Sequence, residues 1–187
     1  MDRYYIDRFL AANAELVTGD GLEVQEDRYL SRTSAGRLRS VTTFQLAYPG
    51  TGRLVGDLTR PDALPEDLFD CFICTQTINF LYDVHSAMRS CYRLLKPGGH
   101  LLLTVAGISQ LSRYDADRWG DFWRFTPQGL ARLAQEVFGD VTVSAWGNVL
   151  AATALLHGLV TEELDPAELD AMDPDYPVVI SLLGTKA

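Results

Sequence analysis

Two apolar runs decide the fold: Phe69-Asp70-Cys71-Phe72-Ile73-Cys74-Thr75 and His100-Leu101-Leu102-Leu103-Thr104-Val105. Continuous apolar runs of this length are typical of strands that a parallel sheet buries on both faces. Between them, residues 81–95 carry apolar side chains at helical spacing, and Pro97-Gly98-Gly99 ends that helix. A strand, a crossover helix and a second strand in this order predict a right-handed βαβ unit.

The segments on either side of this unit extend the same architecture. We expect a helix over residues 2–17, and Thr126 as N-cap and Pro127 as first residue of a helix through Phe138. An apolar helix or lid is predicted over 149–160 and an acidic loop with one short helical turn over 162–175. Strands are predicted over 21–25, 41–46, 53–55, 141–146 and 176–185. With the last two strands as an antiparallel edge, the fold class is α/β: a Rossmann-like, doubly wound, mostly parallel sheet of about seven strands in three layers.

Length and composition set limits on the class of protein. A chain of 187 residues favours a single domain, 1–187, and 47% hydrophobic with 22% charged residues is typical of a globular chain. The net charge of −9 and the lack of any Lys or Arg run argue against nucleic acid and anionic membranes as partners. No window approaches the ~18 apolar residues of a membrane span. We therefore expect a cytoplasmic protein with a small-molecule substrate. The sequence is compatible with a homodimer.

The three cysteines do not indicate a metal site. Cys71 and Cys74 have CxxC spacing, but they lie in the apolar run 69–75, and no second Cys or His pair follows at zinc spacing. We interpret all three, with Cys91, as buried thiols and predict no metal.

Three motifs resemble those of class I S-adenosylmethionine (SAM)-dependent methyltransferases. They are LKPGGHLLL at 95–103, LPEDLFDCFIC at 64–74 and VGDL at 55–58, in family order and at family spacing. The resemblance is good from about Leu54 to Phe138. It implies the methyltransferase fold, SAM as cofactor and a site at the carboxyl edge of the sheet.

The resemblance also assigns cofactor-binding positions. Asp57, followed by Leu58, stands where the family has an acid that accepts a hydrogen bond from the adenine amino group, although a solvated turn aspartate is the alternative. Glu23 matches the acid of the first strand. The segment Thr75-Gln76-Thr77-Ile78-Asn79 follows the buried strand where the family lines the methyl-transfer cleft, although such residues also cap helices. Thr75, Gln76 and Thr77 are its candidate cofactor-binding residues.

The chain departs from the family at two contacts to the cofactor. The glycine-rich turn after the first strand is missing, and Gln25 stands where the first glycine should be. No acid ends the second strand to hold the ribose hydroxyls. Either Glu26 or Asp27 supplies this contact, or SAM affinity falls, because one charge-assisted hydrogen bond contributes roughly 1.5–3 kcal/mol.

The long aromatic segment 108–125 is the predicted substrate loop. Tyr114, Trp119, Trp123 and Arg124 are its candidate substrate-binding residues, with the two tryptophans as stacking walls for a sugar or polyketide intermediate. The alternative is a structural clamp.

The sequence gives least information about the catalytic residues. Asp115, Asp117 and Asp121 are available as general bases, with Asp121 and His157 as the candidate catalytic residues. Each aspartate could instead pair with an arginine of the same loop. Tyr4 and Tyr5 could cap the cofactor or simply pack.

These observations predict a SAM-dependent methyltransferase acting on an oxygen or nitrogen of a small molecule in biosynthesis or secondary metabolism. In-line methyl transfer needs positioning and often one base or none, so the absence of a triad does not count against it. The alternative is a methyltransferase-fold protein that has lost methyl transfer and acts as a cyclase, another non-redox enzyme or a non-catalytic partner.

Overall fold

The computed structural model describes residues 1–187 and contains one seven-stranded sheet in the order β3-β2-β1-β4-β5-β7-β6. The strands are β1 (Gly19–Val24), β2 (Leu38–Gln45), β3 (Arg53–Val55), β4 (Phe69–Thr75), β5 (Leu95–Ala106), β6 (Val141–Trp146) and β7 (Val179–Thr185). Strands β1 to β5 pair in parallel, while β7 pairs antiparallel with both β5 and β6. The predicted fold class is confirmed.

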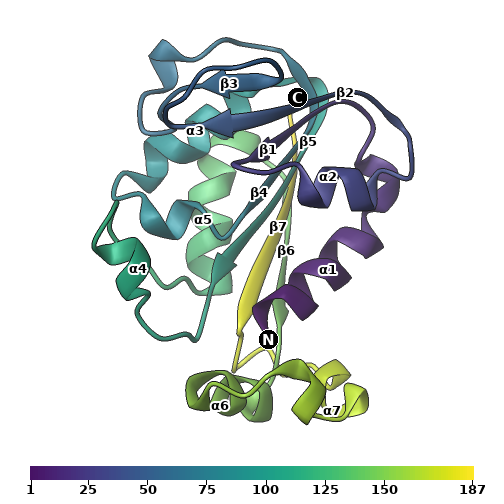
Figure 1. The fold of residues 1–187 in the computed structure, drawn as a ribbon, viewed down its shortest axis with the longest axis vertical. Helices are drawn as coiled ribbons and strands as arrows, with labels where there is room; N and C mark the ends of the chain where they lie inside the picture. Colours follow the sequence, from purple (N-terminus) through teal and green to yellow (C-terminus); the bar gives the residue numbers. More distant parts are fainter.

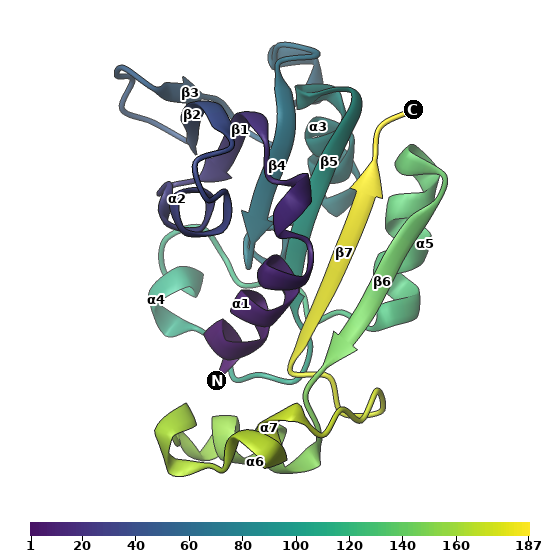
Figure 2. The same ribbon diagram turned by 90° about the vertical axis from the view of Figure 1, so that its right-hand side faces the viewer.

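Helices cover both faces of this sheet, as Figures 1 and 2 show. One face carries α3 (Val84–Leu94) and α5 (Pro127–Phe138), and the other carries α1 (Asp2–Ala12) and α2 (Arg28–Thr33). The short α4 (Arg113–Ala116) lies beside the carboxyl ends of the parallel strands. At the same end of the molecule, α6 (Val149–His157) and α7 (Pro166–Asp170) form the connection from β6 to β7. Four 3₁₀ turns complete the fold: Ala14–Leu16, Pro61–Ala63, Ile78–Phe80 and Thr161–Glu163.

Local sequence accounts for the central β4–α3–β5 unit. The side chain of Asp83 caps α3 by accepting a hydrogen bond from the Ser86 N–H (2.9 Å). Gly98 has φ +78°, and a Cβ on Gly99 would lie 2.9 Å from the Phe69 carbonyl oxygen. This return to the sheet therefore needs both glycines, one for its backbone angle and one for close packing.

Several element boundaries differ from the sequence-based prediction. The helix predicted over 2–17 ends at Ala12, and β5 begins at Leu95 rather than at His100. Two helices were not predicted, α2 and α4, because each is a single turn or little more and its stability depends on packing and caps. The capped start of α5 at Thr126 and Pro127 is confirmed, with the Thr126 hydroxyl accepting from the Gly129 N–H.

The core forms two apolar layers, one on each face of the sheet. The larger packs α3 and α5 against the sheet, and the smaller packs α1, α6 and α7 against the opposite face. All three cysteines are buried and unpaired, as predicted, and no cluster of His, Cys, Asp or Glu could hold a metal ion. None of the helices has the length and hydropathy required to cross a bilayer.

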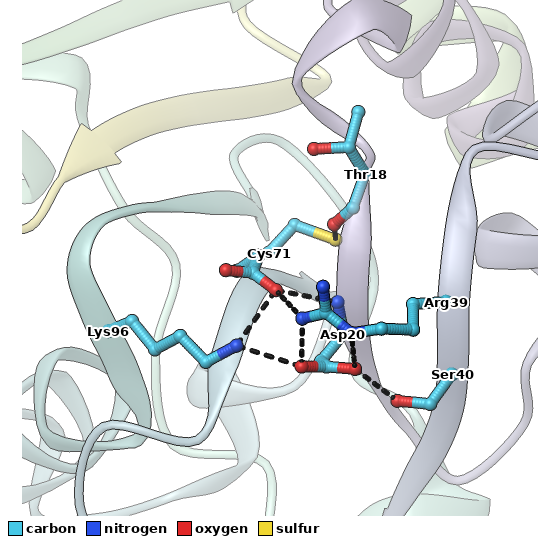
Figure 3. Close-up of polar contacts among 7 residues, drawn as sticks. Thr18, Asp20, Arg39, Ser40, Cys71 and Lys96 are labelled. Carbon is cyan, nitrogen blue, oxygen red and sulfur yellow. Dashed lines mark hydrogen bonds and ion pairs between the residues drawn. The ribbon is translucent and has the colours of Figure 1, made fainter.

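A charged cluster ties together the amino ends of four strands (Figure 3). Lys96 Nζ lies 2.8 Å from Asp20 and 2.9 Å from Asp70, and Arg39 pairs with both carboxylates. Ser40 adds a hydroxyl hydrogen bond to Asp20 (2.8 Å). Two carboxylates pair with two cationic side chains here, so every charge of the cluster has a partner within the chain. It stabilises the edge of the sheet opposite the cavities described below.

Candidate active site

A cavity of about 470 Å³ opens at the carboxyl ends of β1, β2 and β4. Its size lies within the range of small-molecule sites, and its place is the one where open α/β sheets bind ligands. The seven predicted cofactor-binding residues all line this first cavity: Glu23, Gln25, Asp57, Leu58, Thr75, Gln76 and Thr77. The structure therefore brings together the side chains that the motifs singled out along 55 residues of chain.

Gln25 adopts the backbone conformation that a glycine would adopt at this turn. Its φ is +68°, and the Glu26 N–H donates across it to the Val24 carbonyl (2.9 Å), closing a three-residue turn. The Gln25 carbonyl in turn accepts a hydrogen bond from the Gln45 side chain. Left-handed geometry costs a non-glycine residue roughly 1–2 kcal/mol. The turn is thus preserved without glycine, and the Gln25 side chain lies in the cavity wall instead of filling the cavity.

Glu23 is the most buried acid of the site, with 3% exposure. Its two carboxylate oxygens accept the backbone N–H groups of Tyr29 (3.1 Å) and Leu30 (2.8 Å), which hold the start of α2. Burial raises the pKa of Glu23 to about 7, although these two hydrogen bonds oppose the shift. Glu23 therefore both anchors α2 and contributes a carboxyl group to the cavity wall.

Asp57 is a turn residue that also lines the first cavity. One carboxylate oxygen accepts the Thr59 N–H (2.8 Å) and the Thr59 hydroxyl (2.7 Å), which makes Asp57 a turn residue. Its second oxygen has only Arg60 nearby, at 3.8 Å, and the residue lines the cavity. That oxygen is free to accept a hydrogen bond from a ligand.

The two acids proposed as replacements for the missing ribose contact occupy different positions. Glu26 lines the first cavity, whereas Asp27 precedes α2 and lies outside the cavity wall. At the end of β2, the Gln45 side chain is occupied by Gln25, and Leu46 presents an apolar side chain to the cavity. Glu26 is the carboxylate that remains for a ribose hydroxyl.

The donor set and the apolar walls fit an adenosyl cofactor. Phe44, Leu46 and Leu58 provide apolar surface for a purine, while Asp57 and Glu26 provide acceptors for an amino group and hydroxyls. SAM, when bound, supplies the electrophilic methyl group. These residues would hold its adenosyl part.

The substrate loop divides into a part that lines the first cavity and a part that fastens the loop. Tyr114 and Trp119 line the cavity and contact each other edge to face, with ring centroids 6.1 Å apart. Trp123 does not line it. Its indole N–H donates to the Leu81 carbonyl (3.1 Å), and its ring packs near Tyr82.

A second cavity of about 370 Å³ adjoins the first. Gln76 and Asp115 lie in the walls of both, and Asp121 and Arg124 line the second. Arg124 holds both oxygens of Asp121, at 2.6 and 2.9 Å, and the Ser112 N–H donates to the same carboxylate. Hydrogen bonds from Arg124 lower the pKa of Asp121. A carboxylate so fully engaged is a better clamp than a base.

Three other candidates lie away from the cavities. His157 is exposed at the end of α6, and the α6 residue that reaches the second cavity is Leu155. Tyr5 is fully buried, with its hydroxyl donating to the Leu169 carbonyl (3.1 Å), and Tyr4 donates to Asp170. Both tyrosines therefore pack against α7 and do not cap the first cavity.

Sequence reasoning missed Arg3, Phe80 and Asn79, which also line the two cavities. Asn79 lies in the polar segment 75–79 that the sequence singled out, although it was not among the candidate site residues. Arg3 had no signal, since only packing brings the start of α1 to this edge.

Comparisons with known proteins agree with this geometry. Residues 33–103 match the family model described as a methyltransferase domain. A 56-residue stretch is 45% identical to the ubiquinone/menaquinone biosynthesis C-methyltransferase UbiE of Pectobacterium carotovorum, covering 28% of this chain and 22% of that protein. The chain thus spans about a fifth of the curated relatives it matches.

Solved structures extend the likeness to nearly the whole chain. The N-methyltransferase NodS from Bradyrhizobium japonicum, in complex with S-adenosyl-L-homocysteine, is 13% identical with a TM-score of 0.60, over 99% of this chain and 87% of that one. The [4+2]-cyclase SpnF is 17% identical with a TM-score of 0.61, over 96% and 81%. The chain therefore has the fold of class I SAM-dependent methyltransferases, and residues 33–103 match the model of a methyltransferase domain.

Proposed function

We propose that this protein transfers a methyl group from SAM to an oxygen or nitrogen of a small molecule. The observation that carries the proposal is the open first cavity, in which all seven motif-assigned residues meet and the Gln25 turn keeps its shape without glycine. An acidic chain without basic runs favours a small acceptor over a nucleic acid.

The adjoining cavities suggest how donor and acceptor would be held. The first cavity binds the cofactor, and the second, about 370 Å³, receives the acceptor. Gln76, Phe80 and Asp115 form the wall common to both, where the reacting atoms would meet. Holding two reactants in line and excluding water accounts for most of such a catalytic effect.

Asp115 is the base that the geometry favours. It lines both cavities, and the partner of its carboxylate is Ser112, whose hydroxyl donates to Oδ2 at 2.5 Å. Oδ1 is therefore free to accept the proton of an acceptor hydroxyl or ammonium group. Asp121, held by Arg124, positions the loop.

The second candidate function is a methyltransferase-fold enzyme or partner protein that no longer transfers methyl groups. The missing glycine and the missing second-strand acid favour it, and SpnF is an example of a similar fold in a protein described as a cyclase. The two candidates differ in whether SAM binds productively.

Thermal melting with SAM and with S-adenosylhomocysteine (SAH) tests the proposal. A ligand that binds only the folded state stabilises it by RT ln(1 + [L]/Kd), about 2.7 kcal/mol at 100 Kd. We expect a clear rise in melting temperature for wild type at millimolar SAM. A rise in Gln25→Gly alone would support the second candidate, with a blocked site.

Two neighbouring acids give a matched pair within the same experiment. Glu26→Ala should weaken SAM binding by roughly tenfold if one hydrogen bond to a ribose hydroxyl is lost. Asp27→Ala removes an adjacent charge outside the cavity and should leave the shift unchanged. Equal effects of the two variants would contradict a specific contact by Glu26.

A further inference from the structure

Two residues that line the second cavity each carry a buried side-chain atom without a hydrogen-bond partner. The atoms are Nε2 of Gln76 and Oδ1 of Asn79, and Asn79 is only 2% exposed. The chain has one other such atom, Thr104 Oγ1, and Thr104 does not line that cavity. Since a buried polar atom without a partner costs about 1–3 kcal/mol, two in one cavity call for an explanation.

The backbone fixes where both residues sit. Gln76 has φ +45°, and its N–H donates to the Thr104 carbonyl (2.8 Å) at the end of the sheet. The Asn79 carbonyl accepts the N–H groups of Phe122 and Trp123, both at 3.1 Å, so the substrate loop is attached to this residue. Gln76 is therefore fixed by a backbone hydrogen bond to the sheet, and Asn79 by backbone hydrogen bonds to the substrate loop.

The unpaired atoms are complementary to a ligand group of one kind. An amide nitrogen donates and an amide oxygen accepts, so a group that satisfies both must accept one hydrogen bond and donate another. Arg124 is occupied by Asp121, whereas Asp2 and Asp115 line the same cavity without a cation from it, so the cavity disfavours an anionic group. Phe80, Ala106, Leu155 and Val178 supply apolar surface to the same cavity.

We propose that Gln76 and Asn79 form a subsite for a neutral hydroxyl or primary carboxamide group on the acceptor. Gln76 Nε2 donates to its oxygen, and Asn79 Oδ1 accepts from its O–H or N–H. The assignment rests on the proposed function in making the second cavity the acceptor pocket. It adds the chemistry of the group that this pocket selects.

Fragment titration of the SAH-saturated protein tests the subsite. Phenol and benzamide each present a donor and an acceptor, toluene has neither, and benzoate and benzylammonium are charged counterparts. Following the side-chain amide resonances of Gln76 and Asn79 by NMR, we expect phenol and benzamide to shift both and to bind more tightly than toluene and benzoate. Benzylammonium has no acceptor and should leave the Gln76 resonance unshifted.

Asn79→Leu separates a binding role from a structural one. Removing one neutral hydrogen bond corresponds to about a two- to tenfold weaker phenol affinity, while toluene affinity should not fall. Because Asn79 Oδ1 is unpaired, the same change should leave the melting temperature equal or higher. The matched control is Asn148→Leu: Asn148 is also buried but makes three side-chain hydrogen bonds, so its loss should lower the melting temperature.

Gln76→Met provides a second variant that removes the donor at similar volume, and it should weaken phenol binding if Asn79→Leu fails to fold. Phenol affinity unchanged in both variants, or benzoate binding as tightly as phenol, would overturn the subsite, as would no probe binding at the solubility limit. Absence of SAH binding would overturn only the proposed function, because the probes are also titrated into the free protein.

Discussion

At the scale of single residues, the site shows acids placed in contrasting surroundings. Glu23 is buried and bonded to two backbone N–H groups, while Glu26 faces the cavity and Asp57 has one oxygen engaged and one free. The surroundings of each acid, rather than its position in a motif, determine whether it anchors the backbone or is available to a ligand.

Glu23 should make stability depend on pH near neutrality. Its folded pKa of about 7 lies above the ordinary value of about 4.3, so the folded state holds its proton while the unfolded chain ionises. Stability from this group is full below about pH 4.3 and is lost as pH rises to 7. Relative to Glu23→Gln, the free energy of unfolding of wild type should fall across that window by on the order of 2 kcal/mol.

Denaturant unfolding of both proteins between pH 4 and 8 measures this difference. A difference that stays constant over the whole range would contradict the raised pKa of Glu23.

At the scale of elements, the loop between β5 and α5 is ordered by a few specific ties. Arg124 holds Asp121 and also donates to the Gln110 carbonyl (2.6 Å), and Trp123 bonds to the Leu81 carbonyl. These contacts make the loop a structural clamp, which was one of the two interpretations of its sequence. The loop also brings Tyr114 and Trp119 to the first cavity.

Arg124→Met should loosen this loop. It leaves the Asp121 carboxylate, whose side chain is 0% exposed, without its cation, and we expect a loss of roughly 2–4 kcal/mol in the free energy of unfolding. Limited proteolysis should show faster cleavage within residues 108–125. Arg113→Met is the control, because Arg113 makes no side-chain ion pair or hydrogen bond, and an equal loss there would contradict the clamp.

At the scale of the whole molecule, the amino and carboxyl ends of the strands differ in the polar groups that they carry. The amino ends of β1, β2, β4 and β5 are joined by the charged cluster of Figure 3, in which each charge has a partner. The carboxyl ends carry the cavities and the unpaired polar atoms. Ion pairs therefore gather at one end of the strands, and cavities with unpaired polar atoms at the other.

The charged cluster should give the protein an acid-sensitive component of stability. Hydrogen bonds from Arg39, Lys96 and Ser40 hold the pKa of Asp20 well below its ordinary value. A lowered folded pKa stabilises the protein above about pH 3.9 and ceases to do so as pH falls below it. Asp20→Asn should therefore be less stable than wild type at pH 7 by roughly 1–3 kcal/mol, with a smaller difference at pH 2–3.

Asp62→Asn serves as the reference for this measurement, because Asp62 is exposed and forms no ion pair or side-chain hydrogen bond. A deficit of Asp20→Asn that is as large at pH 2 as at pH 7 would show that the charge of Asp20 is not its cause.

The sequence alone determined the central architecture of this protein. The apolar runs at 69–75 and 100–105, the intervening helix and the Pro97-Gly98-Gly99 break specify β4–α3–β5, because each depends on neighbouring residues and on which side chains must leave water. The same local chemistry placed Thr126 and Pro127 at the start of α5. The motifs also named seven of the residues that line the first cavity.

Only the tertiary structure decided which side chains face a ligand and which are already satisfied. Asp121 is paired with Arg124, α6 presents Leu155 rather than His157 to the second cavity, and Asn79 keeps an unpaired oxygen. Each outcome depends on contacts between segments distant in sequence, and hydrophobic periodicity carries no information about them. A hydrogen bond is directional and short, so whether a polar atom finds a partner is settled only when those segments pack.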